Sequence, residues 1–104
     1  MKHKTTLIVR GGGDLASGVI HRLYKCGYQV LVLECAKPSA IRRRVSFGEA
    51  VYDGTSSVEG VTGRLIKDVS ECWKVWDEKE IPILVDENAD AVSELKPDAL
   101  IDAI

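Results

Sequence analysis

The sequence predicts an α/β protein: a doubly wound parallel sheet of about five strands with helices on both faces. Three observations predict it. Short apolar runs alternate with segments of helical apolar spacing. A helical segment, and no hairpin turn, joins the first two runs, as in a right-handed crossover between parallel strands. A glycine-rich turn separates the first run from that helix. The expected strand order is 3-2-1-4-5.

The first elements are two buried strands and the helix between them. Residues 5–9 are expected as the first strand and residues 29–35 as the second. Both runs are almost entirely apolar, as in a parallel sheet that helices cover on both faces. Apolar residues recur at helical spacing over residues 15–26, and Gly27 follows as a helix stop.

The middle of the chain is less regular. Residues 45–52 are interpreted as a helix, although their apolar residues do not form one narrow stripe. Residues 53–57 are expected as a loop. Residues 61–67 alternate only partly and contain Gly63, which indicates a short third strand at the sheet edge.

The last third of the chain predicts a packed helix and two further strands. Asp68 or Ser70 can cap the helix, which should end near Lys79. Its buried face is expected to carry Val69, Cys72, Trp73 and Trp76, so the tryptophans are interpreted as core residues. The remaining elements are a strand at 81–85, a short helix at 90–95 and a strand at 98–103.

The glycine-rich turn carries the chemistry. Gly11, Gly13 and Ala16 fill the three small-residue positions of G-x-G-x-x-G/A. The first lets the chain turn, the second lets backbone N–H groups approach a pyrophosphate, and the third lets helix and strand pack closely. The pattern predicts a Rossmann-like nucleotide site; the alternative is a purely structural turn. The residues expected at the cofactor are Arg10, Gly11, Gly12, Gly13, Asp14, Leu15 and Ala16.

Two acids qualify this site. Glu34 follows Gly11 by 23 positions, close to the roughly 20 expected for the acid that holds a ribose diol. In that role Glu34 would favour NAD over NADP; the alternative is a solvated acid at a strand end. Asp14 lies where a pyrophosphate would sit and would repel it, so Asp14 is expected to cap the helix instead of serving catalysis or a metal.

Three consecutive arginines offer a second contact with phosphate. Arg42, Arg43 and Arg44 cannot share one helix face, so at least one should be exposed to solvent. Arg42 and Arg43 are the candidates for binding a cofactor phosphate, because a guanidinium matches phosphate bidentately.

Other candidates lie where strands end. In the expected order, the site falls at the carboxyl ends of strands one and four. Cys35 is a candidate sulfur acceptor there, against the alternative of a small buried apolar residue. Asp86 and Asp102 are candidates for binding a metal or substrate, against the alternative of capping the turns that follow.

Composition narrows the class of protein. The 104 residues suit one domain, residues 1–104, and the formal net charge of −2 predicts no attraction to nucleic acid or an anionic membrane. No apolar run approaches the roughly 20 residues of a membrane span, and the N-terminus lacks a signal peptide, so we expect a cytoplasmic protein. The three cysteines form no C-x-x-C motif, which argues against a zinc site or a disulfide framework. The apolar end at 100–104 suggests a piece of a longer protein.

Several motifs together resemble a known family. The most specific are R-G-x-G-D-L-A-[ST]-G at 10–18 and R-R-x-V-[AS]-F-x-E-A-V-Y within 42–54; the others lie at 30–34, 58–62, 81–86 and 97–102. The chain resembles, over essentially its whole length, the bacterial accessory proteins of selenium-dependent molybdenum hydroxylases, which are related to xanthine dehydrogenase accessory factors. The resemblance implies a Rossmann-type protein needed to mature, sulfurate or insert a molybdenum cofactor. It implies no established catalytic residue, and it implies members longer than this chain.

Three functional hypotheses follow. The first is an accessory domain for molybdenum-hydroxylase maturation, whose partners are the hydroxylase or its maturation machinery. Its ligand would be NAD, a related dinucleotide, or the molybdenum cofactor as cargo. The second is an NAD-dependent oxidoreductase domain without its catalytic part, since no paired acid and base is evident. The third is a ligand-sensing or assembly module with a degenerate site, which Asp14 keeps open. The catalytic residues and the existence of an enzyme activity stay undetermined, and a homo-oligomer stays open.

Overall fold

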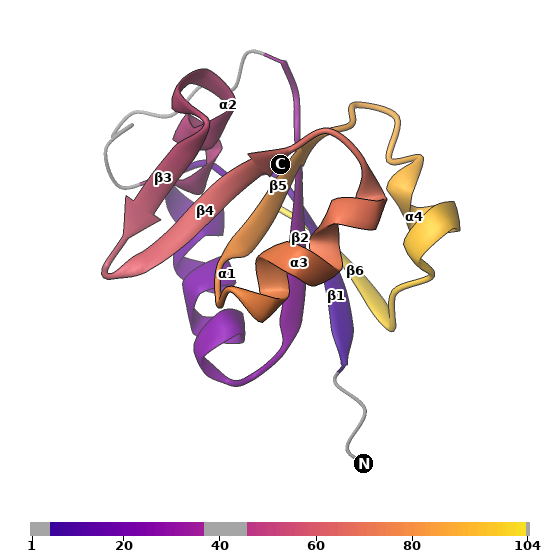
Figure 1. Ribbon diagram of the computed structural model, residues 1–104, viewed down its shortest axis with the longest axis horizontal. Coiled ribbons are helices and arrows are strands. Elements are labelled where there is room, and N and C mark those ends of the chain that lie inside the picture. Colours follow the sequence, from indigo (N-terminus) through magenta and orange to yellow (C-terminus); the bar gives the residue numbers. More distant parts are fainter. Residues whose placement is uncertain (1–4, 37–45, 104) are drawn as a thin grey trace.

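Figure 1 shows the computed structural model, which describes residues 5–36 and 46–103, without the side chains of Asp14 and Leu15. Its strands are β1 Thr6–Arg10, β2 Gln29–Glu34, β3 Thr55–Val58, β4 Val61–Ile66, β5 Ile81–Val85 and β6 Ala99–Asp102. Its α-helices are α1 Asp14–Lys25, α2 Ala50–Asp53, α3 Cys72–Asp77 and α4 Ala91–Leu95, with 3₁₀ turns η2 Phe47–Glu49 and η3 Val69–Glu71. The expectation of an α/β protein is confirmed.

The sheet has six strands in the order β3-β4-β5-β2-β1-β6. All neighbours pair in parallel except β3 and β4. The five predicted strands correspond to β1, β2, β4, β5 and β6, and their predicted order 3-2-1-4-5 is wrong. Strand β5 lies beside β2, in register Val32↔Ile83, while β1 lies between β2 and β6. Strands alternating with helices favour parallel crossovers, but they do not fix on which side of the sheet each new strand is added.

A further strand occupies the segment expected as a loop. Thr55–Val58 pairs antiparallel with β4, so β4 is not the sheet edge. Glu59 and Gly60 join the two strands with φ of 47° and 83°. Two positive φ values in a two-residue connection are typical of the type I′ turn that matches strand twist.

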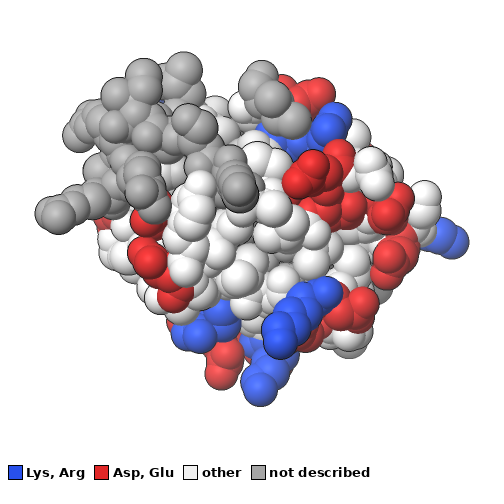
Figure 2. All heavy atoms as spheres, turned by 90° about the horizontal axis from the view of Figure 1, so that it is seen from above, with Lys and Arg blue, Asp and Glu red and all other residues white. Residues whose placement is uncertain are grey.

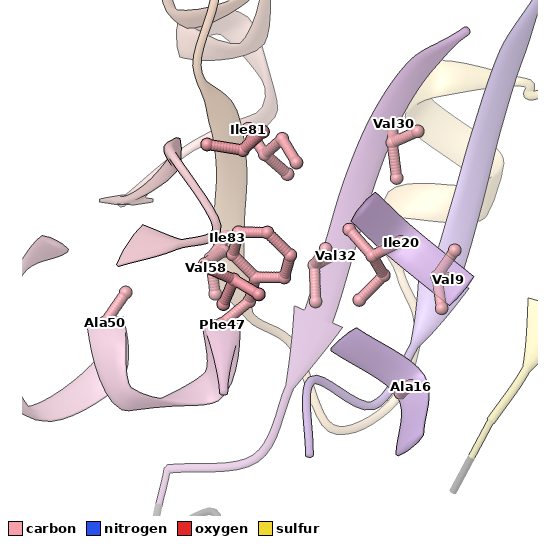
Figure 3. Packing of buried hydrophobic residues seen from close by; sticks show 11 residues of the cluster. Val9, Ala16, Ile20, Val30, Val32, Phe47, Ala50, Val58, Ile81 and Ile83 are labelled. Atoms are coloured by element: carbon pink, nitrogen blue, oxygen red, sulfur yellow. The ribbon is translucent and has the colours of Figure 1, made fainter. Parts of the chain in front are cut away.

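Two apolar layers cover the sheet. On one face, α1, η2 and α2 pack on alternate strand residues; Figure 3 shows Ala16 and Ile20 of α1 and Phe47 of η2 among them. On the other face, α3 and α4 pack on Ile8 and Leu33 and their neighbours. All the residues of both layers that form the core are less than a tenth exposed. Helices therefore lie on both faces, and the carboxyl ends of the parallel strands emerge between the layers.

The helix after β4 begins as the sequence indicates but turns differently. Asp68 caps η3, and Glu71 completes a capping box by accepting from the Asp68 N–H. Because the first turn is 3₁₀, the buried stripe runs through Val69, Cys72 and Val75. The prediction that Trp73 is a core residue is wrong, since its exposed fraction is 54%.

Trp76 is partly buried, and its indole Nε1 donates to the Val30 carbonyl at 3.0 Å.

The segment predicted as a helix from Val45 to Tyr52 begins, within the described residues, as η2 at Phe47 and continues as α2. No helix among residues 5–36 and 46–103 is long and apolar enough to cross a membrane.

Candidate functional site

The site lies where neighbouring strands lead to opposite faces of the sheet. After β2, the next described elements, η2 and α2, pack on the α1 face, whereas α4 follows β5 onto the other face. Because β2 and β5 are neighbours, the crevice for a ligand is expected at their carboxyl ends. The sequence placed the site at the carboxyl ends of strands one and four, which are β1 and β5 here. This location is corrected to the ends of β2 and β5, with the end of β1 adjacent.

The glycine turn follows β1 directly. Gly11 takes φ of 103°, a conformation that side chains rarely adopt, and its N–H donates to the Leu33 carbonyl at 2.7 Å. Gly13 is the N-cap of α1, and no side-chain cap bond is present there. Helix α1 begins with Asp14, and the prediction that the Asp14 carboxylate caps this helix concerns a side chain that the structure does not describe. Ala16 is buried against the sheet, as the third small position requires.

Glu34 reaches back to this turn. Its Oε2 accepts from the Gly12 N–H at 2.6 Å, and its Oε1 accepts from the Cys35 N–H at 2.9 Å. The spacing that predicted an acid near the turn therefore brings the two together. Roughly half of the carboxylate's approximately four acceptor positions are used by these bonds.

The Gly12 carbonyl is held from the opposite side. Three groups donate to it: the Gly48 N–H at 2.8 Å, the Ser17 hydroxyl at 3.0 Å and the Ser46 hydroxyl. The Ser17 hydroxyl in turn accepts from the Phe47 N–H at 2.8 Å. Ser17 and Ser46 are only 1% and 2% exposed. Because a trans peptide is planar, fixing the Gly12 carbonyl aims the Gly13 N–H the opposite way.

Gly48 forms a third wall that sequence reasoning missed. A Cβ on Gly48 would lie 3.0 Å from the Gly12 oxygen and 3.2 Å from Glu34 Oε2. A Cβ on Gly12 would lie 2.9 Å from the Gly48 nitrogen. Two glycines are therefore needed for the backbones to approach this closely. The available signal was Gly48 following Ser46 within the motif at 42–54.

A pocket of about 250 Å³ opens beside the turn, at the β2–β5 crevice. It is lined by Arg10, Leu33, Glu34, Cys35, Asp86 and Glu87. Leu33 belongs to the apolar layer under α3 and α4, and Arg10 is its register partner on β1. Since side chains alternate along a strand, the pocket lies on the α4 face and the Glu34 side chain on the α1 face. The expected grouping of Arg10, Glu34, Cys35 and Asp86 thus appears, around a different pair of strands.

Each acid near the pocket has a structural partner. Asp86 accepts from the Asp90 and Ala91 N–H groups at 3.0 and 2.8 Å, so it caps the turn into α4. Glu87 accepts from the Ala36 N–H at 3.1 Å. Asp102 lies 3.6 Å from the Arg10 guanidinium, across the β1–β6 pair. The capping alternative therefore describes Asp86.

The remaining candidates divide between surface, core and undescribed chain. Arg42 and Arg43 lie outside the described residues, as does Arg44. Cys35 is partly exposed at the pocket, whereas burial raises the pKa of the Cys72 thiol to about 12. Within 5–36 and 46–103, no three His, Cys, Asp or Glu side chains are grouped to hold a metal. Figure 2, which looks down on the upper side of Figure 1, shows acidic and basic side chains interspersed where grey atoms do not cover the surface.

Comparison with known proteins gives one informative relative. The chain is 46% identical over 98 residues to the uncharacterized protein YqeB of Escherichia coli strain K12. The match covers 94% of this chain but only 18% of that protein. No family model matches the sequence, and no solved structure matches it.

Proposed function

We propose that this chain is a Rossmann-like nucleotide-binding domain that serves the maturation of molybdenum hydroxylases. The observation that supports nucleotide binding is the Glu34 carboxylate held against the Gly12 N–H, at the glycine turn and beside the β2–β5 pocket. The maturation role rests on the motifs at 10–18 and 42–54 and the family they resemble. The partners would be a molybdenum hydroxylase or its maturation machinery in the cytoplasm.

The proposed binding mode uses each part of the turn differently. The start of the 12-residue helix α1 offers backbone N–H groups and a partial positive charge to a phosphate. Glu34 has acceptor positions left for a ribose diol after its bonds to Gly12 and Cys35. An acid at this position would repel a 2′-phosphate, so NAD or a related dinucleotide is favoured over NADP. The molybdenum cofactor, which also carries phosphate, is the alternative cargo.

One observation favours a second candidate, a sensing or assembly module with a degenerate site. The Gly12 N–H already binds the Glu34 carboxylate, and a carboxylate in this place substitutes for a ligand anion. In that case Glu34 is an internal strut and the turn binds no nucleotide. The two candidates predict opposite results in a titration.

The test of binding is calorimetric titration with NAD, NADP and AMP. We expect NAD and AMP to bind and NADP to bind at least about tenfold more weakly, because of charge repulsion at Glu34. Gly13→Val should abolish binding, since a branched side chain would stand where phosphate approaches. Glu34→Gln should weaken it about tenfold, the loss of one charge-assisted hydrogen bond. The matched control Glu78→Gln, on an exposed residue after α3, should change nothing. No binding of any of the three at millimolar concentration supports the degenerate site.

The maturation role needs its own measurement. The protein would be purified from molybdate-replete cells, and bound pterin would be measured by fluorescence after oxidation. We expect pterin to accompany the wild type and to be lost from Gly13→Val. Pterin-free wild type, with nucleotide binding intact, would contradict cofactor cargo and leave a nucleotide-binding domain of another role.

A further inference from the structure

The β2–β5 pocket has the wrong charge for a phosphate. Its lining holds one cation, Arg10, and the carboxylates of Asp86 and Glu87, whereas Glu34 lines it from the end of β2 with its carboxylate turned to the Gly12 N–H on the α1 face. The Arg10 guanidinium lies 3.6 Å from Asp102, which offsets part of its charge. An anion entering this space would meet net negative charge, so the part of a ligand that occupies it is neutral or cationic.

The pocket is large enough for only one part of a nucleotide. Its volume of about 250 Å³ is below the roughly 300–1,000 Å³ of pockets that hold a whole drug-sized ligand. Leu33 and Cys35 contribute an apolar wall. A single flat heterocycle, attached to a sugar that passes Glu34, matches both the volume and the position at the end of β2.

The polar groups select the edge of that heterocycle. Ionised carboxylates only accept hydrogen bonds, and a guanidinium only donates them. Glu87 uses its Oε2 for the Ala36 N–H, which leaves its other oxygen for a ligand, whereas Asp86 has a helix-cap bond on each oxygen. The lining therefore suits a base with adjacent N–H donors on one edge and acceptors on another.

We propose that this pocket takes a guanine-type base in preference to adenine. Guanine carries two adjacent donors, N1–H and N2–H, for a carboxylate, and it carries O6 and N7, the acceptors that arginine binds most often. Adenine offers one exocyclic amino group and no O6. This inference rests on the proposed function, because the base enters as part of the nucleotide held at the glycine turn, and it narrows the proposed ligand from NAD to a related dinucleotide with a guanine base. Glu87 and Arg10 are its specificity residues.

The first experiment is calorimetric titration with GMP, IMP and AMP. IMP lacks the 2-amino group, so it isolates one of the two donors. We expect GMP to bind about ten- to a hundredfold more tightly than AMP, with IMP between them. Glu87→Gln should remove most of this preference, and the control Glu94→Gln, on the exposed side of α4, should retain it. AMP binding as tightly as GMP, or a preference unchanged in Glu87→Gln, would overturn the proposal.

A second readout separates this proposal from the proposed function. Guanosine has no phosphate, so it tests the pocket without the glycine turn. Alkylation of Cys35 should be slowed by guanosine but not by adenosine, while the exposed Cys26 serves as the internal reference. Protection of Cys35 by guanosine without nucleotide binding in the titration would contradict the proposed function and support the base pocket. Nucleotide binding without base preference or protection would do the reverse, and failure of both measurements would contradict both.

Discussion

The backbone N–H of Gly12 donates a 2.6 Å hydrogen bond to Oε2 of Glu34, which lies 22 residues later in the chain. This bond connects the turn after β1 to the end of β2, directly after Arg10 and Leu33, the last residue pair of these two strands. On its other side, Gly12 is locked by Ser17, Ser46 and Gly48. The protein's own hydrogen bonds therefore fix the turn in one conformation, so a ligand bound there would lose little free energy to ordering of the backbone.

Close approach at Gly12 predicts a large effect of one added methyl group. Gly12→Ala would place Cβ 2.9 Å from the Gly48 nitrogen, so the free energy of unfolding should fall by about 1–3 kcal/mol. Gly18→Ala, within helix α1, is the matched control, because a Cβ at Gly18 would have no neighbouring atom within 4 Å. It should stabilise the protein by about 0.5–1 kcal/mol. Urea unfolding measures both; equal effects of the two variants would refute the tight packing of Gly12 on Gly48.

The buried serines predict a second difference. Ser17→Ala removes a donor to the Gly12 carbonyl and the acceptor of the Phe47 N–H, which stays buried without that partner. The free energy of unfolding should fall by about 1–3 kcal/mol. Ser93→Ala, on the exposed surface of α4, should change it by less than about 0.5 kcal/mol. Thermal and urea unfolding compare them, and a Ser17→Ala protein as stable as Ser93→Ala would contradict the network.

The two tryptophans should differ although they touch. Their ring centroids are 5.6 Å apart, and their ring planes meet at 77°. Of the two, only Trp76 donates a hydrogen bond to the backbone, at the Val30 carbonyl. Trp76→Phe should therefore lose about 0.5–1.5 kcal/mol of stability, whereas Trp73→Phe, at an exposed position, should lose little. Tryptophan emission of each single-Trp variant checks the environment: the remaining Trp76 should emit at shorter wavelength than the remaining Trp73. The reverse order would contradict the placement of α3.

Cys72 predicts a loss of stability at alkaline pH. Burial raises the pKa of its thiol to about 12, above the unfolded value near 9, so the folded state keeps the proton longer. The stabilisation is complete below about pH 9 and is lost as the pH rises towards 12, at about 1.4 kcal/mol per unit. Because lysines and tyrosines also titrate there, the measured quantity is the difference between wild type and Cys72→Ala. A difference independent of pH between 8 and 11 would show that the thiol ionises freely.

Local features of the fold could be predicted from the sequence, and the sheet order could not. The turn at Gly11, the helix after it and strand β5 follow from residue types and short-range periodicity. The position of β5 beside β2 depends on which apolar faces fit together over long sequence distances, so alternation of elements does not determine it. Strand β3 was missed because Thr55-Ser56-Ser57 carries no apolar alternation; the Glu59-Gly60 turn was its usable signal.

The candidate site shows the same division. The spacing of Glu34 from the glycines predicted their proximity, because strands joined by one helix are often neighbours, as β1 and β2 are here, although β5 and β6 are not. The contact of Ser46 and Gly48 with Gly12 could not be predicted, since it depends on the burial of Phe47 in a core built from strands distant in the sequence. The grouping of Arg10, Cys35 and Asp86 survived a wrong strand order because all three lie at carboxyl ends of parallel strands.

The most direct test of the central claim is an amide NMR titration of the chain with AMP, with inorganic phosphate as the second ligand. If the glycine turn and Glu34 together hold a nucleotide, AMP should shift the amide resonances of Gly12, Gly13 and Cys35 in a saturable way. Phosphate alone should shift Gly13 more than Cys35, because it lacks the ribose that reaches Glu34. Unchanged Gly12 and Gly13 resonances at millimolar AMP would contradict a nucleotide site and leave Glu34 as an internal strut.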